Sequence, residues 1–342
     1  MSKLRLTSVG ALLFAFAMGG WGGQKTPLTL LQSILLPGLH DGDFDQFAVD
    51  HEGRRLFVAA EENSVIEVID LRTNKLMRTI SGLKAPHSLV YRPDVRKLFI
   101  ADGGAPEVKI YSGDSYEPIG SIPLEGNPDL IAYDSTTQYM YVTNSRPGDS
   151  AHLSYSLISV VNSATGKKLG DIKLDSEHVD AMALEKSGPR LFVNLTSENT
   201  VGVIDREKRD LIATWSIVQE ARQNLALEFD EASRRLFTVT RKPGKLIVLD
   251  SDSGKIISSL LCVDMVDGIV FDARSKRIYV PGNEFVDVFE ERDSNNYVLL
   301  AHVQGAFRAK TGILVPELNR FYLAVPHHGD KSAEVRVFNV SP

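Results

Sequence analysis

Cysteine is nearly absent from this chain of 342 residues, and the single thiol, Cys262, allows no disulfide within one molecule. The fold must therefore be held together by its hydrophobic core. Cys262 lies in the apolar run "SSLLCV", where a cysteine is more often a small buried hydrophobic group than a nucleophile. The same scarcity excludes a covalently attached c-type haem, which requires Cys-x-x-Cys-His.

Common catalytic signatures are also missing. The sequence contains no Gly-x-Ser-x-Gly, no His-Glu-x-x-His and no phosphate-binding P-loop. Basic residues are not in excess, since 38 lysines and arginines stand against 44 aspartates and glutamates, which gives a formal charge of -6. Because binding to nucleic acid draws most of its free energy from clustered cations, we do not expect a nucleic-acid partner.

Long hydrophobic runs are missing after the amino-terminal segment. There, Lys3 and Arg5 precede about ten apolar residues and then a group of glycines, which is the layout of a signal peptide. The run is too short to span a bilayer, for which roughly 20 apolar residues are needed. We expect residues 1–23 to be a signal peptide and residues 24–342 to form one domain, exported to the periplasm or the extracellular space without a transmembrane segment.

The chain contains seven copies of one sequence motif. Each copy is a basic or polar turn followed by an aliphatic, an aromatic and an aliphatic residue. The copies include "RRLFVAA" (54–60), "QYMYVTN" (138–144) and "NRFYLAV" (319–325). Their aromatic residues are separated by 42, 42, 51, 45, 42 and 43 positions: Phe57, Phe99, Tyr141, Phe192, Phe237, Tyr279 and Tyr322. A period of about 40 to 50 residues built from strands is typical of a β-propeller blade.

Each unit has the pattern of four short strands with period-two alternation between turn residues, which predicts an all-β, seven-bladed propeller of four-stranded antiparallel blades. The seventh unit ends after its third strand, whereas a spare strand, "LTLLQSILLPG" (28–38), precedes the first unit. We expect this strand to complete the last blade and close the ring, which leaves fewer open strand edges. The repeated aromatic residue should pack between neighbouring blades.

The literal "YVTN" at 141–144, its degenerate copies and units such as "NSVIEVIDLRTNKLMRTI" (63–80) resemble the YVTN family of seven-bladed β-propeller repeat proteins. That family is found in exported and surface-layer bacterial proteins. The resemblance covers the chain after about residue 27 and implies a propeller of the quinoprotein amine dehydrogenase-like kind. It does not imply one activity, because propellers of this kind include lactonases and plain binding scaffolds.

A polar residue stands just before the first strand of every unit. In a four-stranded meander these positions lie on one face, around the mouth of the central channel, together with the loops between the second and third strands. The residues concerned are Asp45, His87, Asp129, Asp180, Asn224, Asp267 and Lys310. Loops and entering segments add acidic and histidine residues on the same face: His40, Asp41, Asp43, Glu61, Glu62, Asp102, Asn144, His178, His327 and His328.

The opposite face receives the basic turns that precede each second strand. These turns carry Arg54, Arg55, Arg96, Lys97, Arg190, Arg234, Arg235, Lys276, Arg277 and Arg320. The sequence thus predicts a molecule that is acidic at the channel entrance and basic at the exit.

Three interpretations of the acidic mouth remain open. The aspartates and the asparagine could bond to backbone N–H groups in turns, as such residues do in loops. Alternatively, His87, Asp129, Asp180 and Asp267 could hold a divalent cation, Ca²⁺ or Mg²⁺, because converging like charges are costly unless neutralised. In the third interpretation, Asp45, His87, Asp129, Asp180, Asn224 and Asp267 bind a small molecule or a protein partner.

We therefore expect a monomeric, exported, non-catalytic propeller that binds a ligand or partner at its acidic mouth. The alternative is an enzyme, a lactonase-like hydrolase or lyase. It would use aspartate and histidine residues at the mouth, with a divalent cation polarising a carbonyl group.

Overall fold

A computed structural model describes residues 26–145 and 155–341 of the chain. The expected signal peptide, residues 1–23, lies outside the described residues, as does most of the insertion that makes the third repeat unit long. In the described part of the chain, no helix has the length and apolar character needed to cross a membrane.

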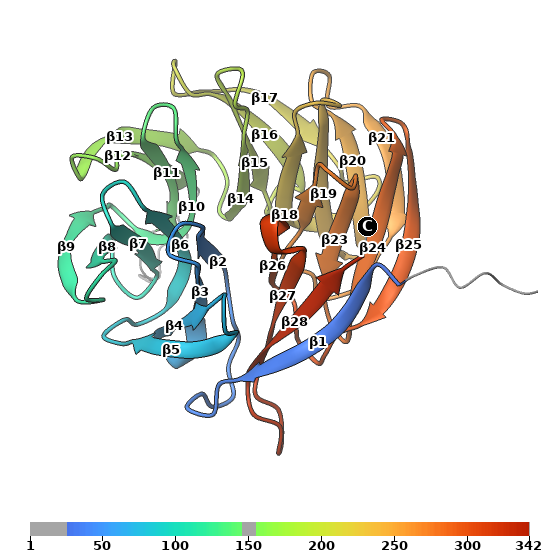
Figure 1. The fold of residues 1–342 in the computed structure, drawn as a ribbon. Coiled ribbons are helices and arrows are strands. Elements are labelled where there is room, and N and C mark those ends of the chain that lie inside the picture. Colours follow the sequence, from blue (N-terminus) through green and yellow to red (C-terminus); the bar gives the residue numbers. More distant parts are fainter. Residues whose placement is uncertain (1–25, 146–154, 342) are drawn as a thin grey trace, which may run out of the picture.

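Seven four-stranded antiparallel sheets are arranged in a ring, as predicted (Figure 1). Blade one comprises β2 (Phe47–Asp50), β3 (Arg55–Ala60), β4 (Val65–Asp70) and β5 (Lys75–Ile80). Blade two comprises β6 (Pro86–Arg92), β7 (Lys97–Asp102), β8 (Glu107–Ser112) and β9 (Pro118–Pro123). Blades three and four comprise β10 (Asn127–Asp134), β11 (Tyr139–Ser145), β12 (Ser156–Asn162), β13 (Lys167–Leu174) and β14 (Val179–Leu184), β15 (Arg190–Leu195), β16 (Thr200–Asp205), β17 (Asp210–Ser216).

The remaining blades follow the same order. Blades five and six comprise β18 (Arg222–Asp230), β19 (Arg235–Lys242), β20 (Gly244–Asp250), β21 (Ile256–Leu261) and β22 (Val270–Asp272), β23 (Arg277–Pro281), β24 (Phe285–Asp293), β25 (Asn296–Gln304). Blade seven comprises β26 (Gly312–Val315), β27 (Arg320–Val325), β28 (Glu334–Val340) and β1 (Leu28–Leu35). Two short 3₁₀ turns, η1 (Glu61–Asn63) and η2 (Pro316–Leu318), interrupt the strands.

Strand β1 closes the ring. It pairs antiparallel with β28, from Leu28 opposite Val340 to Leu35 opposite Glu334, and the two strands lie side by side in Figure 1. Residues 36–46 then lead from this outer strand to β2, the first strand of blade one. The prediction that an amino-terminal strand completes the last blade is confirmed, and the same connection carries Asp43 and Asp45 into the first blade.

The repeated aromatic residues pack between blades, as expected. Phe57 stacks on Tyr91 of blade two with ring centroids 5.4 Å apart, and Phe192 lies 5.1 Å from Phe229 of blade five. The same contact recurs where blade five meets blade six and where blade six meets blade seven. At the other boundaries Phe99, Tyr141 and Tyr322 pack in apolar clusters that include residues of the next blade. Because aromatic side chains bury a large apolar area, this packing between blades explains why the sequence motif is repeated.

The turns before the second strands do not form a free basic surface. Arg55 pairs with Asp50, the last residue of β2, and Arg190 pairs with Glu185, the residue after β14, both at 2.7 Å and within one blade. Lys276 of blade six pairs with Asp230 of blade five, and Arg206, in the turn after β16 of blade four, pairs with Asp134 of blade three. The predicted basic exit is thus largely neutralised, because most of its cations pair with acidic residues beside them, which the repeat pattern alone does not reveal.

Candidate functional site

Three predicted mouth residues lie on β-bulges at the start of the first strands. His87 and Ser88 of β6 together oppose a single residue of β7, and β10 and β14 have the same irregularity at Asp129 and Asp180. A bulge leaves its extra residue unpaired and bends the strand, which re-aims side chains. The bulges therefore take these side chains out of the regular alternation of the ladder at the points where the first strands begin.

His87 gathers the carboxylates of blades one to three. Its Nδ1 lies 2.8 Å from Asp45 Oδ2, 3.7 Å from Glu61 Oε1 and 3.8 Å from Asp129 Oδ1. Burial disfavours the charged imidazole, but the hydrogen bond to Asp45 and the charges of Asp129 and Glu61 raise the pKa of His87 to about 9. At neutral pH His87 is therefore a cation that neutralises part of the group.

Fixed cations neutralise a second group, on the side of blades five to seven. Lys310 Nζ lies 2.8 Å from Asp267 Oδ2 and 3.1 Å from Asp43 Oδ2. Arg241 also binds Asp267, at 2.9 Å, and Arg308 binds Asp43 at 2.6 Å. We call the five acidic residues of the two groups, together with Asp180 near them, the carboxylate cluster: Asp43, Asp45, Glu61, Asp129, Asp180 and Asp267.

Asp180 differs from the other members of the cluster. Its carboxylate forms no hydrogen bond or ion pair with any described residue. Burial and the nearby charges of Asp129, Asp267 and Asp45 hold its pKa well above the ordinary value. The side chain of Asp129 is 46% exposed. Even so, partial loss of hydration and the negative charge of Asp45 raise the pKa of Asp129 to about 6. The cluster thus contains two carboxylates whose charge the protein does not fully compensate.

Two cavities meet at Asp180. One, of about 190 Å³, lies among the first strands of the blades and is also lined by Asp267 and Glu228. Burial raises the pKa of Glu228 to about 7. The other, of about 450 Å³, is a groove over blades four and five that extends from Asp129 and Asp180 to Arg222 and Lys242. We call it the lateral groove.

Asn224 does not join the cluster. It stays in the ladder of β18, opposite Thr240, because the bulge of this blade falls one position later, at Leu225. Its side chain is fully buried and donates hydrogen bonds to Asn194 Oδ1 at 2.8 Å and to the backbone oxygen of Thr200 at 2.9 Å. The prediction of one mouth residue in every blade is therefore wrong for blade five.

Other candidate residues serve the backbone or each other. Asp102 is buried, accepts hydrogen bonds from the N–H groups of Lys84 and Ala85, and pairs with Lys109. His327 pairs with Asp41 across the closure of the ring. For Asp102, the interpretation that acidic residues bond to backbone N–H groups holds.

The described residues contain one group of at least three side chains with suitable ligand atoms for a metal ion. These are Asp45, His87 and Asp129, whose ligand atoms all lie within 4.8 Å of one another. Oxygen and imidazole ligands suit several divalent cations. A metal ion would have to replace the proton through which His87 and Asp45 are hydrogen-bonded.

Sequence reasoning missed four basic residues of this region. Arg241 and Lys242 end the second strand of blade five, Arg222 begins the first strand of that blade, and Arg308 precedes blade seven. Arg222 and Lys242 pair directly in the ladder between β18 and β19. All four lie at or near strand ends that face the mouth. A search of those strand ends for charged residues of both signs could have identified them.

Gly103 provides a test of how His87 is held. A Cβ atom at Gly103 would lie 2.5 Å from His87 Nε2 and 2.6 Å from its Cδ2, so the Gly103→Ala substitution should force the imidazole out of the position in which Nδ1 bonds to Asp45. We expect the pKa of His87 to fall from about 9 towards its ordinary value, because the hydrogen bond that favours the charged form is lost. NMR titration of the imidazole signals measures this change. Gly120→Ala, where a Cβ atom meets nothing within 4 Å, is the control. An unchanged titration in the Gly103 variant would show that the contact does not position the ring.

No family model and no curated protein matches this chain. Among solved structures it is similar to a chain in the crystal structure of the mitotic checkpoint complex, with 13% identity and a TM-score of 0.75 over 99% of this chain and 100% of that chain. It is also similar to Kuenenia stuttgartiensis hydrazine synthase, with 15% identity and a TM-score of 0.67 over 91% and 96% of the two chains. The chain is a seven-bladed, WD40-like β-propeller. At these identities the likeness shows the fold alone, and the resemblance to the YVTN family stays a prediction.

Proposed function

We propose that the protein is an exported binding protein that uses its carboxylate cluster to hold a cationic group of a ligand or protein partner. Export rests on the signal-peptide pattern of residues 1–23. The propeller supplies a rigid scaffold, and the mitotic checkpoint complex, an assembly that contains a similar chain, is consistent with a role in binding.

The observation that carries the proposal is the position of Asp180. Its carboxylate lines both cavities and has no hydrogen-bond or ion-pair partner among the described residues. A half-buried carboxylate that is repelled by Asp129, Asp267 and Asp45 and has no bonded partner is unfavourable, and a bound cation would supply the missing compensation. Asp129, which also lines the lateral groove, is the second carboxylate within reach of the same cation.

The lateral groove adds polarity to the site. It begins at two carboxylates and contains Arg222 and Lys242, both exposed. A ligand that lies along the groove would therefore place its cationic group at Asp129 and Asp180 and an anionic or hydrogen-bond-accepting group towards the two basic side chains. A basic amino acid or a basic peptide segment has this arrangement.

Replacement of Asp180 by asparagine should separate binding from stability. In the ligand-free protein, Asp180→Asn removes a charge that is repelled by its neighbours, so we expect the melting temperature to rise by a few degrees. The same change should weaken binding of L-arginine at least about tenfold, equivalent to about 1.4 kcal/mol. Calorimetric titration and thermal unfolding measure the two effects.

Asp175→Asn is the matched control, because this aspartate lies nearby in the chain but its side chain is 90% exposed. Agmatine, which lacks the carboxylate of arginine, reports on the contribution of Arg222 and Lys242 and should bind more weakly than L-arginine. If neither compound binds the unaltered protein, or if Asp180→Asn leaves the affinity unchanged, the proposed site is wrong.

The group formed by Asp45, His87 and Asp129 supports a second candidate, a divalent-cation site that serves a hydrolase or lyase. It is less well supported, because a protonated His87 is neither a metal ligand nor a general base at neutral pH. Metal analysis of the purified protein and of the His87→Ala variant tests it: this candidate requires bound metal in the former and its loss in the latter.

A further inference from the structure

A cavity of about 560 Å³ lies between blades six and seven, away from the carboxylate cluster. We call it the rim pocket. It is lined by the segment that follows β25, by the loop between β27 and β28, by the start of β28 and by Leu35 at the end of β1. The strand that closes the ring thus supplies part of the wall of the rim pocket through Leu35. Its volume is in the usual range for sites that bind small molecules.

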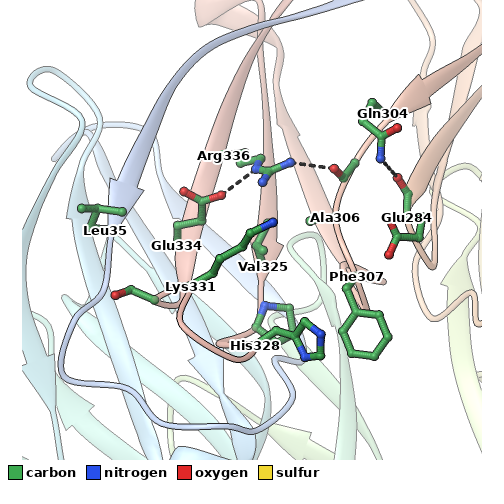
Figure 2. A pocket seen from close by; sticks show the side chains of 13 residues that line it. Leu35, Glu284, Gln304, Ala306, Phe307, Val325, His328, Lys331, Glu334 and Arg336 are labelled. Carbon is green, nitrogen blue, oxygen red and sulfur yellow. Dashed lines mark hydrogen bonds and ion pairs between the residues drawn. The ribbon is translucent and has the colours of Figure 1, made fainter.

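One end of the rim pocket is aromatic. The rings of Phe307 and His328 lie with centroids 4.2 Å apart and an interplanar angle of 31°, and Figure 2 shows them together at this end. Phe307 is 38% exposed and Leu35 on the opposite wall is 60% exposed, so the pocket presents apolar surface to water. A planar apolar group bound here would remove this surface from water, which is favourable.

The other end is polar, and its geometry is fixed by the protein. Arg336 donates from Nε to Glu334 Oε1 and from Nη1 to the backbone oxygen of Gly305, both at 2.6 Å. These two bonds hold the guanidinium but leave Nη2 without a hydrogen-bond partner among the described residues. Arg336 thus has donor capacity to offer a ligand.

Lys331 supplies a second cation. Its ammonium forms no hydrogen bond or ion pair within the described part of the chain, and Figure 2 shows its side chain extending through the pocket in the direction of Arg336. The turn that carries it is closed by reciprocal backbone bonds between His328 and Lys331, at 3.0 and 3.1 Å. This turn fixes the spacing between the aromatic end of the pocket and its cationic end.

We propose that the rim pocket binds a small aromatic carboxylate. The ring of the ligand would pack beside Phe307 and His328, and its carboxylate would lie between Lys331 and Arg336. An anion is favoured over a cation because Glu334 is already engaged by Arg336, whereas Lys331 has no acidic partner. A single negative charge is favoured over two because Glu284 lies on the far wall and would repel a second.

Three indole compounds of similar size and different charge test this proposal: indole-3-acetate, indole-3-acetamide and tryptamine. Titration calorimetry with the purified protein should show binding of the acid, binding of the neutral amide weaker by about tenfold or more, and no binding of the amine. Phe307→Ala should weaken binding of the acid to a similar degree. Because Phe307 is partly exposed, this variant should remain folded, which thermal unfolding verifies.

The Lys331→Glu variant adds a test in which one ligand should gain affinity while another loses it. In this variant the acid should no longer bind and tryptamine should gain affinity, because the charge between the walls is reversed. Asp330→Asn, in the same turn but not among the pocket-lining residues, should bind the acid as the unaltered protein does. The proposal is overturned if the acid fails to bind at millimolar concentration. It is equally overturned if acid and amide bind alike, or if neither Phe307→Ala nor Lys331→Glu changes the affinity. None of these outcomes affects the carboxylate cluster.

Discussion

Ile34→Asp should unfold the protein or lower its melting temperature by more than about 15 °C, a loss of several kcal/mol, because it places a charge in the core at the ring closure. Ile34 is 4% exposed and belongs to the hydrophobic cluster that joins blade seven to blade one. Strand β1 is the outer strand of blade seven, so loss of its docking leaves β28 with an open edge and uncovers its apolar face. Circular dichroism during heating measures the effect.

Leu31→Asp is the control for this experiment. Leu31 lies on the same strand but is 49% exposed, so its replacement should change the melting temperature by little. A protein that tolerates aspartate equally at both positions would not need β1 for closure, and the arrangement of the first and last blades would have to be revised.

Glu185→Gln should cost about 2 kcal/mol of unfolding free energy at pH 7, because it removes the buried one of the two carboxylates, Glu185 and the more exposed Asp252, that hold Arg190 and Arg234 together across a blade boundary. Glu185 is buried and pairs with Arg190 of its own blade at 2.7 Å and with Arg234 of blade five at 2.6 Å. Hydrogen bonds from Arg190 and Arg234, against the opposing effect of burial, lower the pKa of Glu185 to about 2. Urea unfolding measures the loss.

The contribution of Glu185 to the stability of the fold should depend on pH. Since the pKa of Glu185 is lower in the folded state than in the unfolded chain, its charge stabilises the fold above about pH 4.5, and this contribution is lost as the pH falls towards about 2. The difference between the unaltered protein and Glu185→Gln should therefore shrink over that range. Glu290→Gln, which breaks only the exposed pair with Arg292, should have little effect at any pH. A difference for Glu185→Gln that stays constant down to pH 3 would contradict the assigned ion pairs.

The fold could be predicted because the packing contacts between blades recur at a regular interval along the sequence. One aromatic residue is needed at each blade boundary, so the sequence repeats Phe57 and its counterparts at nearly constant spacing. The closure could be predicted because the strand pattern begins and ends out of phase, which leaves residues 28–38 without a partner in their own repeat unit. Both inferences depend on local patterns that a single sequence displays.

The site was only partly predictable, because it depends on which residues stand outside the strand ladder. Asp129 and Asn224 occupy similar places before their first strands, but the bulge releases Asp129 from the ladder and retains Asn224 in it. A shift of one residue reverses the direction of a side chain. The spacing marks this shift, since the other mouth residues precede the repeated aromatic residue of their unit by 12 positions, whereas Asn224 precedes Phe237 by 13. The ion pairs of Arg241 and Arg308 depend on contacts between blades, which strand periodicity does not reveal.

A crystal structure of the protein grown with L-arginine would test the central claim most directly. The account predicts electron density for the guanidinium within about 3 Å of the Asp180 and Asp129 carboxylates, with the ligand carboxylate directed along the lateral groove. Density at another position, or an empty cluster at a ligand concentration that saturates binding in solution, would contradict it.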